Sequence, residues 1–357
     1  MKIKILIPIY NDWRSVFEVL KNIDQQINDL NDEISVLIVN DGSNEEKENK
    51  SFEFKNIKSI KIINMKKNKG HARCNAVGLK YIFENEDFDY VIPMDGDGED
   101  RPEEIKLLIE KSKDYPYDVI TANRIKRSEG LLFKLCYEVH KLLTLIFTGQ
   151  NIKFGNFVLL PKSVVEKMVN EKATWNSFSG SLSKVSKNRK SIPSMRDKRY
   201  FGSSKMGYSN LILHSLSIIS VYKFTWLVRS IIFLLVYCYF VSNFISFITL
   251  IPVVATIVLN GMIFTLSARE NLEEYKNSLS NIANIDTIKE WKNNFMYFIN
   301  PFKALRPTKE KASSVAVAST DHLGEDGKKE HLKKNPWSYL NVFDAGDDLK
   351  SKEQFKL

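Results

Sequence analysis

From Ser230 to Ala268 the chain runs for 39 residues without a charged side chain. A straight helix of that length would span about 58 Å, roughly twice the 30 Å thickness of a bilayer's hydrocarbon core. Two antiparallel helices fit this thickness, and Asn243 and Pro252 supply turn-forming residues in the middle third. The stretch therefore predicts a transmembrane hairpin over residues 230–268, with helices at about 230–248 and 251–268. The alternative is a pair of buried helices in a soluble protein, which the length without charge disfavours.

Cationic residues stand at both ends of this stretch. Lys223 and Arg229 precede it, and Arg269 and Lys276 follow it. By the positive-inside rule both ends face the cytoplasm. The sequence thus predicts a multi-pass protein of the inner (cytoplasmic) membrane, with its N-terminal domain and its C-terminal tail in the cytoplasm. Residues 207–229, apolar but interrupted by serines, are expected to form a juxtamembrane helix in the membrane interface.

Strand and helix patterns alternate through the N-terminal part of the chain, which we take as one domain over residues 1–206. Near-continuous apolar runs separated by helical patterns are typical of a parallel sheet that is buried on both faces. The expected fold class is therefore α/β, a mostly parallel sheet with helices on both faces, followed by the hairpin. The predicted strands are Ile3–Ile9, Ile34–Asn40, Ser59–Ile63, Tyr90–Met94 and Asp118–Ala122, and the predicted helices are Trp13–Gln26, His71–Asn85 and Pro102–Lys113.

Polar residues directly follow four of these strands. Asp12 follows the first strand and Asp41 the second; Gly70 and Arg73 follow the third, and the string Met94–Glu103 begins at the end of the fourth. Because the carboxyl ends of parallel strands lie at one edge of a sheet, these residues are expected to converge on one ligand site. The chain has no Gly-x-Gly-x-x-Gly or Gly-Lys-Ser/Thr string, which counts against a dinucleotide site and a P-loop.

The most distinctive of these strand ends is Asp95-Gly96-Asp97. Two carboxylates one residue apart on an extended backbone point roughly the same way. They offer the hard oxygen ligands that Mg²⁺ or Mn²⁺ prefers, usually shared with substrate phosphates. An acidic pair on its own is more often a solvated turn. Convergence with three other polar strand ends favours a metal-assisted phosphate site over that alternative.

The order and spacing of five strings carry a family resemblance: Ile7-Pro8-Ile9-Tyr10-Asn11-Asp12, Val39-Asn40-Asp41-Gly42-Ser43, Asn68-Lys69-Gly70-His71-Ala72-Arg73, Met94-Asp95-Gly96-Asp97 and Arg199–Met206. The first four resemble family 2 glycosyltransferases of the Rossmann-like GT-A fold. The fifth resembles the Arg-x-x-Gly-x-Ser-Lys motif of membrane-anchored polyprenyl-phosphate sugar transferases such as dolichol-phosphate mannose synthase. Those enzymes can also carry a C-terminal membrane hairpin. The resemblance covers about residues 1–270.

The resemblance implies a nucleotide-sugar site at this edge of the sheet. It implies a nucleotide-diphosphate sugar as donor, Mg²⁺ or Mn²⁺ as cofactor, and Asp97 as the metal ligand with Asp95 beside it. The residues that it implies for the donor are Pro8, Tyr10, Asp12, Asp41, Gly70, Arg73, Asp95 and Gly96. Those that it implies for catalysis are Asp97, Arg73, Arg199 and Lys205, and those on the acceptor side are Ser204, Lys205 and Asn156.

The motifs define the acceptor less well. The chain reads Gly98-Glu99-Asp100 where the polyprenyl-phosphate synthases usually read Leu-Gln-His, so it resembles a sister group. A hydroxyl acceptor needs a general base. Many relatives supply it from a Glu-Asp pair, but residues 175–183, the approximate region, contain no carboxylate. This leaves Glu99 and Asp100, whose alternative role is to cap the helix after Pro102. An ionised phosphate needs no base, which favours a polyprenyl phosphate over a hydroxyl on a glycolipid or polysaccharide.

Charge and cysteine content narrow the partners further. The net charge is +9, and the three cysteines are far apart, which suits a reducing compartment. Eight cations from Lys184 to Lys205 are expected mainly to face anionic membrane lipids, with only Arg199 and Lys205 assigned to substrate phosphate. Nucleic acid is disfavoured, because these cations lack interleaved aromatic residues and adjoin the hairpin. A non-catalytic nucleotide-binding membrane protein is the alternative from another class, and a homo-oligomer is left open.

The end of the chain is less informative. Residues 269–300 are expected to form cytoplasmic helices, at Asn271–Asn281 and Thr287–Phe298, the second with aromatic residues at helical spacing. Residues 301–357 are polar over most of their length and carry mixed charge, which suits a linker and a C-terminal tail.

Overall fold

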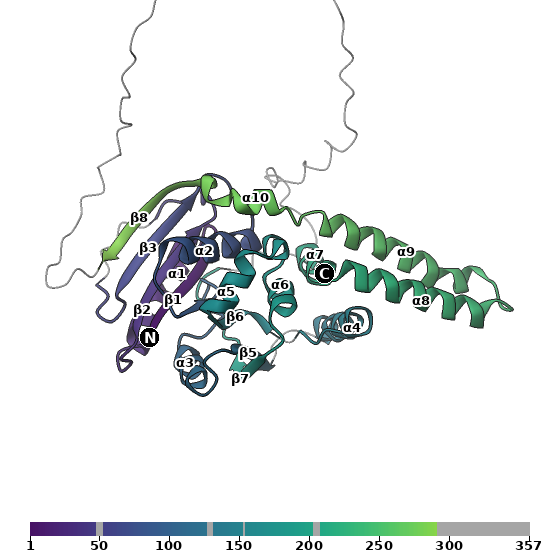
Figure 1. Cartoon of the computed structure of the whole chain (residues 1–357), viewed down its shortest axis with the longest axis horizontal. Coiled ribbons are helices and arrows are strands. Elements are labelled where there is room, and N and C mark those ends of the chain that lie inside the picture. The colour runs from purple at the N-terminus through teal and green to yellow at the C-terminus, as the bar shows by residue number, and fades with distance from the viewer. Residues whose placement is uncertain (48–52, 127–130, 153, 203–207, 291–357) are drawn as a thin grey trace, which may run out of the picture. The chain divides into compact units, whose positions relative to one another are not determined.

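The computed structural model describes residues 1–47, 53–126, 131–152, 154–202 and 208–290 (Figure 1). Strands and helices alternate as the hydrophobic pattern predicts. In chain order the elements are β1 (Lys2–Ile9), α1 (Trp13–Gln26), β2 (Glu33–Asn40), β3 (Ser59–Met65), α2 (His71–Asn85), β4 (Tyr90–Pro93), α3 (Glu104–Asp114), β5 (Val119–Lys126), α4 (Leu131–Thr148), β6 (Phe154–Pro161), α5 (Lys162–Val169), η1 (Lys172–Trp175), α6 (Phe178–Val185), β7 (Arg189–Met195), α7 (Tyr208–Ser220), α8 (Lys223–Val241), α9 (Phe247–Ser267), α10 (Leu272–Lys276), η2 (Ser278–Asn281) and β8 (Ile282–Glu290).

The strands within the described residues form one eight-stranded sheet in the order β7-β5-β6-β4-β1-β2-β3-β8. Its central strands β4, β1, β2 and β3 run parallel, with Ile5 opposite Val36 on one side and Ile92 on the other. Strand β6 runs antiparallel to β4 and β5, and β7 runs parallel to β5. All five strands predicted from apolar runs are present, so the expected mostly parallel α/β sheet is confirmed.

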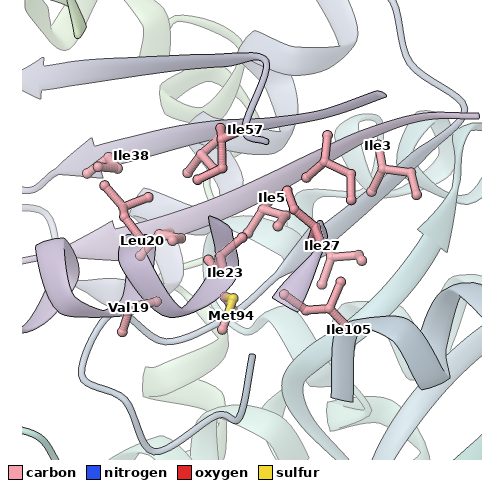
Figure 2. Close-up of a cluster of buried hydrophobic side chains, with 14 of the residues drawn as sticks. Ile3, Ile5, Val19, Leu20, Ile23, Ile27, Ile38, Ile57, Met94 and Ile105 are labelled. Carbon is pink, nitrogen blue, oxygen red and sulfur yellow. The ribbon is translucent and has the colours of Figure 1, made fainter. Parts of the chain in front are cut away.

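Both faces of the sheet are covered, as near-continuous apolar strands require. Ile5 belongs to a core cluster with Leu20 of α1 and Ile105 of α3, which Figure 2 shows. Its neighbour Leu6 belongs to a second cluster with Val77 of α2, because successive side chains of a strand point to opposite faces. The helices therefore hold β1 from both sides and fix where its carboxyl end lies.

Helices α8 and α9 form the predicted hairpin, and both are long and apolar enough to cross a membrane. The side chains of Phe240 and Phe247 are 73% and 93% exposed, so this is not the buried core of a soluble domain. The turn differs from the prediction. It spans residues 242–246, because Ser246 and Thr249 form a capping box that starts α9. Of the two residues expected to form the turn, Asn243 lies in it, whereas Pro252 lies inside α9.

The segment before the hairpin also divides differently from the prediction. The helix expected over residues 207–229 is the shorter α7, and α8 already begins at Lys223. Helix α8 includes Arg229, whose guanidinium donates to the carbonyl oxygen of Ile146 at 2.7 Å, near the C-terminal end of α4. A cation is favourable at that end of a helix. The placement of α7 in a membrane interface stays a prediction.

After α9 the chain returns to the sheet. Residues 271–281 form only the short turns α10 and η2 in place of one longer helix. The helix predicted from Thr287 is wrong over its described part, because Ile282–Glu290 is strand β8, antiparallel to β3. Its β-branched residues favour a strand, and the pairing covers an edge of β3 that would otherwise be exposed. The rest of that predicted helix, residues 291–298, lies outside the described residues.

Candidate functional site

The loop between β4 and α3 carries the acidic pair at the carboxyl edge of the sheet. Gly96 packs on β1, where a Cβ would lie 2.9 Å from a methyl group of both Ile7 and Ile9. The carboxylate of Asp100 turns back into the loop and accepts a hydrogen bond from the backbone N–H of Asp95 at 2.9 Å. Close packing on one side and a buried carboxylate within the loop together hold the pair in place.

Arg199 joins the ends of two strands. One of its terminal nitrogens donates to Asp97 Oδ2 at 2.7 Å, and the other donates to the carboxylate of Asp12, which follows β1. Asp12 also accepts a hydrogen bond from the hydroxyl of Ser15 at 2.5 Å. A guanidinium fork can bridge two carboxylates in this way, and an ammonium cannot match that planar geometry. The predicted residues Asp12, Asp97 and Arg199 are thus brought together.

Arg196 is a second arginine at this loop. The sequence led us to expect it to face lipid headgroups, but it pairs with Glu99, and its Nη2 lies 3.8 Å from Asp95 Oδ2. A sequence does not reveal which of many neighbouring cations will fold back onto a carboxylate. The only available signal was its position, three residues before Arg199 in a segment that leaves a strand.

Residues Arg196–Phe201, which we call the arginine segment, pack against the acidic loop and form hydrogen bonds with it. The N–H of Tyr200 donates to the carbonyl oxygen of Asp97 at 3.0 Å. Its ring lies against Gly98, where a Cβ would come within 2.7 Å of ring atoms, and Gly98 has a φ of +89° that disfavours other residues. Asn22 of α1 donates to the hydroxyl of Tyr200 at 2.7 Å. Glycine at this position therefore lets the arginine segment approach the acidic pair.

Carboxylates outnumber guanidinium groups in this cluster. Asp12, Asp95, Asp97 and Glu99 meet two arginines, which leaves two negative charges when all groups are ionised. Burial and the neighbouring Asp95 raise the pKa of Asp97 to about 6, although Arg199 opposes this rise. Crowded carboxylates with an excess of two negative charges fit a divalent cation in charge and in ligand type.

Among the residues that the structure describes, no three His, Cys, Asp or Glu side chains form a group that could hold a metal ion. Asp95 and Asp97 would therefore bind a divalent cation only together with other oxygen ligands. Substrate phosphates commonly supply such ligands to Mg²⁺. The acidic pair is thus suited to a metal that arrives with its substrate.

Asp41, expected to hold the donor's base, makes contacts that shape a neighbouring loop. Its buried carboxylate accepts hydrogen bonds from the backbone N–H groups of Lys69 and Gly70, both at 2.7 Å. These bonds fix the loop after β3 against the end of β2. Gly70, with a φ of +91°, then starts α2. Asp41 and Gly70 thus meet as predicted, while contact with a base stays a prediction.

The first turn of α2 points the side chains of Arg73 and His71 in different directions, because side chains two apart on a helix lie about 200° apart. The guanidinium of Arg73 lies 5.3 Å from the centre of the Trp175 ring and 3.4 Å from the carbonyl oxygen of Lys69. His71 Nε2 lies 3.5 Å from Asp95 Oδ1. His71 therefore faces the acidic pair, and a role for Arg73 at the diphosphate stays a prediction.

His71 also joins the acidic pair to the expected acceptor side. Its Nε2 lies 2.7 Å from Nδ2 of Asn156, at the start of β6, and 3.1 Å from Nδ2 of Asn75. The predicted residue Asn156 therefore lies close to Asp95. We had not selected His71 as a site residue, although it stands inside the string Asn68–Arg73 that carries part of the resemblance.

The remaining predicted residues lie in three different settings. Pro8 is buried in β1 opposite Val39. Tyr10 follows the end of β1 and is 42% exposed, so its ring is accessible to a ligand. Ser204 and Lys205 lie outside the described residues.

Comparison with known proteins identifies relatives of the sheet domain. Residues 4–163 match the family model for glycosyl transferase family 2. The chain is 25% identical over 219 residues to the undecaprenyl-phosphate 4-deoxy-4-formamido-L-arabinose transferase of Klebsiella pneumoniae (strain 342), covering 59% of this chain and 64% of that protein. It is 26% identical over 229 residues to the uncharacterized glycosyltransferase YkcC of Bacillus subtilis (strain 168), covering 61% of this chain and 68% of that protein. It thus spans less than two thirds of the Klebsiella relative.

Two solved structures are similar at low sequence identity. Residues 1–349 of S. aureus TarS match with 14% identity and a TM-score of 0.44, over 79% of this chain and 89% of that chain. Glucosyl-3-phosphoglycerate synthase from Mycobacterium tuberculosis matches with 14% identity and a TM-score of 0.44, over 64% and 79%.

Proposed function

We propose that this chain, which belongs to glycosyl transferase family 2 through residues 4–163, moves a sugar from a nucleotide-diphosphate donor to a polyprenyl phosphate. The observation that carries the proposal is the cluster of Asp12, Asp95 and Asp97 with Arg199 at the carboxyl edge of the sheet. A diphosphate leaving group needs cationic partners, and this cluster supplies an arginine and the ligands for a divalent metal.

The reaction breaks the bond between the sugar's anomeric carbon and the diphosphate, which leaves with the electron pair. Mg²⁺ or Mn²⁺ held by Asp97 and Asp95 would neutralise the charge that develops on it. Arg199 holds Asp12 and Asp97 side by side, and its donors can exchange carboxylate oxygens for phosphate oxygens. The acceptor oxygen forms the new bond to the same carbon. His71 and Asn156 lie beside Asp95, where they can orient the acceptor.

The acidic loop offers little support for a general base. Asp100 is only 6% exposed and accepts a hydrogen bond from a backbone N–H, and Glu99 is paired with Arg196. A hydroxyl acceptor must lose a proton during attack, whereas an ionised phosphate has none to lose. These contacts favour a phosphate acceptor. The Klebsiella relative, by its name, acts with undecaprenyl phosphate, which is a polyprenyl phosphate.

The hairpin would place the reaction at a membrane. Strands on both sides of it in the chain, β7 before and β8 after, belong to one sheet, so two crossings return the chain to the side where it began. Lys223 and Arg229 in the first two turns of α8, and Arg269 just after α9, favour the cytoplasmic side for the sheet domain. The acceptor's lipid chain would then lie in the bilayer next to α8 and α9.

The test is an assay of the purified full chain with undecaprenyl phosphate, Mg²⁺ or Mn²⁺, and a panel of UDP- and GDP-sugars. We expect metal-dependent transfer to the lipid phosphate and its loss in Asp97→Asn. Transfer only to a hydroxyl acceptor would reject the polyprenyl phosphate. Binding of the donor without turnover of any donor or acceptor would identify a non-catalytic nucleotide-binding protein.

A further inference from the structure

A cavity of about 360 Å³ with mostly polar lining residues lies between the loop after β3 and the segment that follows the hairpin. Its volume falls in the range of small-molecule sites, roughly 300–1,000 Å³. None of its lining residues belongs to the acidic cluster or to the arginine segment. They are Lys66, Lys69, Trp175, Glu274, Asn277, Ser278, Ser280 and Asn281. We refer to this cavity as the Lys66 pocket.

Two buried polar groups in the Lys66 pocket lack a hydrogen-bond partner among the described residues. Ser278 is only 3% exposed, and its hydroxyl oxygen is unpartnered. The side-chain nitrogen of Asn281 is also buried and unpartnered. Buried polar atoms are rarely left unpaired, because each has given up its hydrogen bonds to water without a replacement. The amide nitrogen can only donate, and the hydroxyl also carries a donor.

The two lysines of the pocket each have N–H groups that the hydrogen bonds described here do not use. Lys66 Nζ donates to the carbonyl oxygen of Ser280 at 2.7 Å, and Lys69 Nζ donates to Glu274 Oε1 at 3.0 Å. Each ammonium carries three N–H groups, and these bonds use one of them. The second oxygen of Glu274 accepts from the indole of Trp175 at 3.0 Å. Two ammonium groups and one carboxylate leave a net charge of +1.

Donors from the loop after β3 and from η2 thus line the pocket, with a net positive charge and with two donors that no acceptor among the described residues satisfies. We propose that the Lys66 pocket binds a phosphate group separate from the donor's diphosphate. A tetrahedral phosphate presents several acceptor oxygens at once and can meet Lys66, Ser278 and Asn281 together. The group could come from inorganic phosphate in water or from an anionic lipid headgroup, since α10 begins only a few residues after α9 ends.

Occupancy of the pocket would brace the loop that leads to the active site. The same Lys69 that lines the pocket donates its backbone N–H to Asp41, and Gly70 and His71 follow it directly. The Trp175 ring that lines the pocket also lies beside the guanidinium of Arg73. A bound phosphate would therefore stabilise the first turn of α2 without contacting the acidic pair.

The experiment uses the purified full chain in nanodiscs of phosphatidylcholine, titrated with inorganic phosphate against sodium chloride of equal ionic strength. The thermal midpoint and the ³¹P NMR line width report binding. Lys66→Gln removes a charge at similar length, Ser278→Ala removes the buried hydroxyl, and Lys67→Gln is the matched control on an exposed residue outside the pocket.

We expect phosphate to raise the midpoint of the wild type and of Lys67→Gln. Its affinity should fall about tenfold in Lys66→Gln and Ser278→Ala, the effect of losing one charge-assisted hydrogen bond. Without phosphate, Ser278→Ala should be at least as stable as the wild type, because it removes an unpartnered buried group. This last result separates loss of a ligand contact from loss of folding.

A second arm replaces phosphatidylcholine with phosphatidylglycerol. Stabilisation by this lipid in the wild type and Lys67→Gln, but not in Lys66→Gln, would identify the phosphate as a lipid headgroup. No response to either source overturns the proposal. Competition between a nucleoside diphosphate and phosphate that depends on Lys66 also overturns it, because the pocket would then belong to the donor site. Neither result bears on sugar transfer, which is measured separately.

Discussion

The carboxylates in the loops after β2 and β4 differ in one kind of partner. Both carboxylate oxygens of Asp41 accept backbone N–H groups, whereas Asp97 accepts one, from Glu99 at 3.0 Å, and its other oxygen accepts from the side chain of Arg199. A backbone donor is fixed by the fold. An arginine side chain can rotate and exchange one anionic partner for another. The comparison indicates that Asp41 shapes the site and that Asp97 is available to a ligand.

The sharpest test of this comparison is Asp97→Asn, which keeps the shape of the side chain and removes its charge. We expect the transfer rate to fall by about 10³-fold, the scale of losing a key electrostatic contact in a transition state. The thermal midpoint at neutral pH should not fall, because the amide avoids the cost of burying a charge. The rate of nucleoside diphosphate release and a melting curve in detergent measure the two quantities. If Asp97→Asn lost as much folding stability as is expected for Asp41→Ala, the two carboxylates would not differ in role.

Asp41→Ala should have the converse effect. It leaves the N–H groups of Lys69 and Gly70 without their acceptor, so we expect a loss of about 3 kcal/mol in the free energy of unfolding. Urea unfolding followed by fluorescence measures it. Asp29→Ala is the control, because Asp29 forms only a surface pair with Lys106, so its loss should leave the free energy of unfolding nearly unchanged. Full stability with lost donor binding would instead assign Asp41 to the ligand.

The pH dependence of stability should report the ionisation of Asp97. The pKa of Asp97 is raised from 3.8 to about 6, so the folded chain holds this proton more tightly than the unfolded chain. Its contribution to stability is full below about pH 4 and is lost as pH rises to about 6, by on the order of 2 kcal/mol. Unfolding of Asp97→Asn should lack this decline. A decline of equal size in the variant would mean that other groups cause it.

The smallest expected effect is that of Arg199→Lys. An ammonium keeps the charge but cannot reproduce the fork that bridges Asp12 and Asp97, so we expect kcat/KM to fall about tenfold. Arg14→Lys is the matched control, since Arg14 stacks on Phe201 of the same segment at 3.9 Å. A similar fall of kcat/KM in both variants would show that any disturbance of the arginine segment lowers activity. The bridge between Asp12 and Asp97 would then have no special role.

Much of this architecture could be predicted from the sequence. Apolar runs that end in Asp12, Asp41 and Asp95 identify strands and the edge where their polar residues meet, because that pattern depends only on local burial and strand direction. The uncharged stretch from Ser230 likewise predicts the hairpin. Its turn was misplaced, since Pro252 is tolerated inside α9 once Ser246 has started the helix.

Other contacts depend on tertiary structure that no local pattern contains. Arg196 is one of many neighbouring cations, and only the path of the chain after β7 brings it to Glu99. His71 was passed over because the direction of a side chain in the first turn of α2 depends on how that helix is seated. The strand Ile282–Glu290 forms because the edge of β3 is open to it, and that edge is distant in sequence.

Strand β8 has a consequence for the order in which the molecule is built. Asn64 at the end of β3 bonds to Asp286 of β8, 222 positions later. During synthesis the edge of β3 therefore stays unpaired until α8, α9 and then β8 have left the ribosome. Unpaired strand edges pair readily with other chains. If synthesis stops within the hairpin, the sheet lacks β8 and is prone to aggregate. The sheet can therefore be completed only after the hairpin has been synthesised.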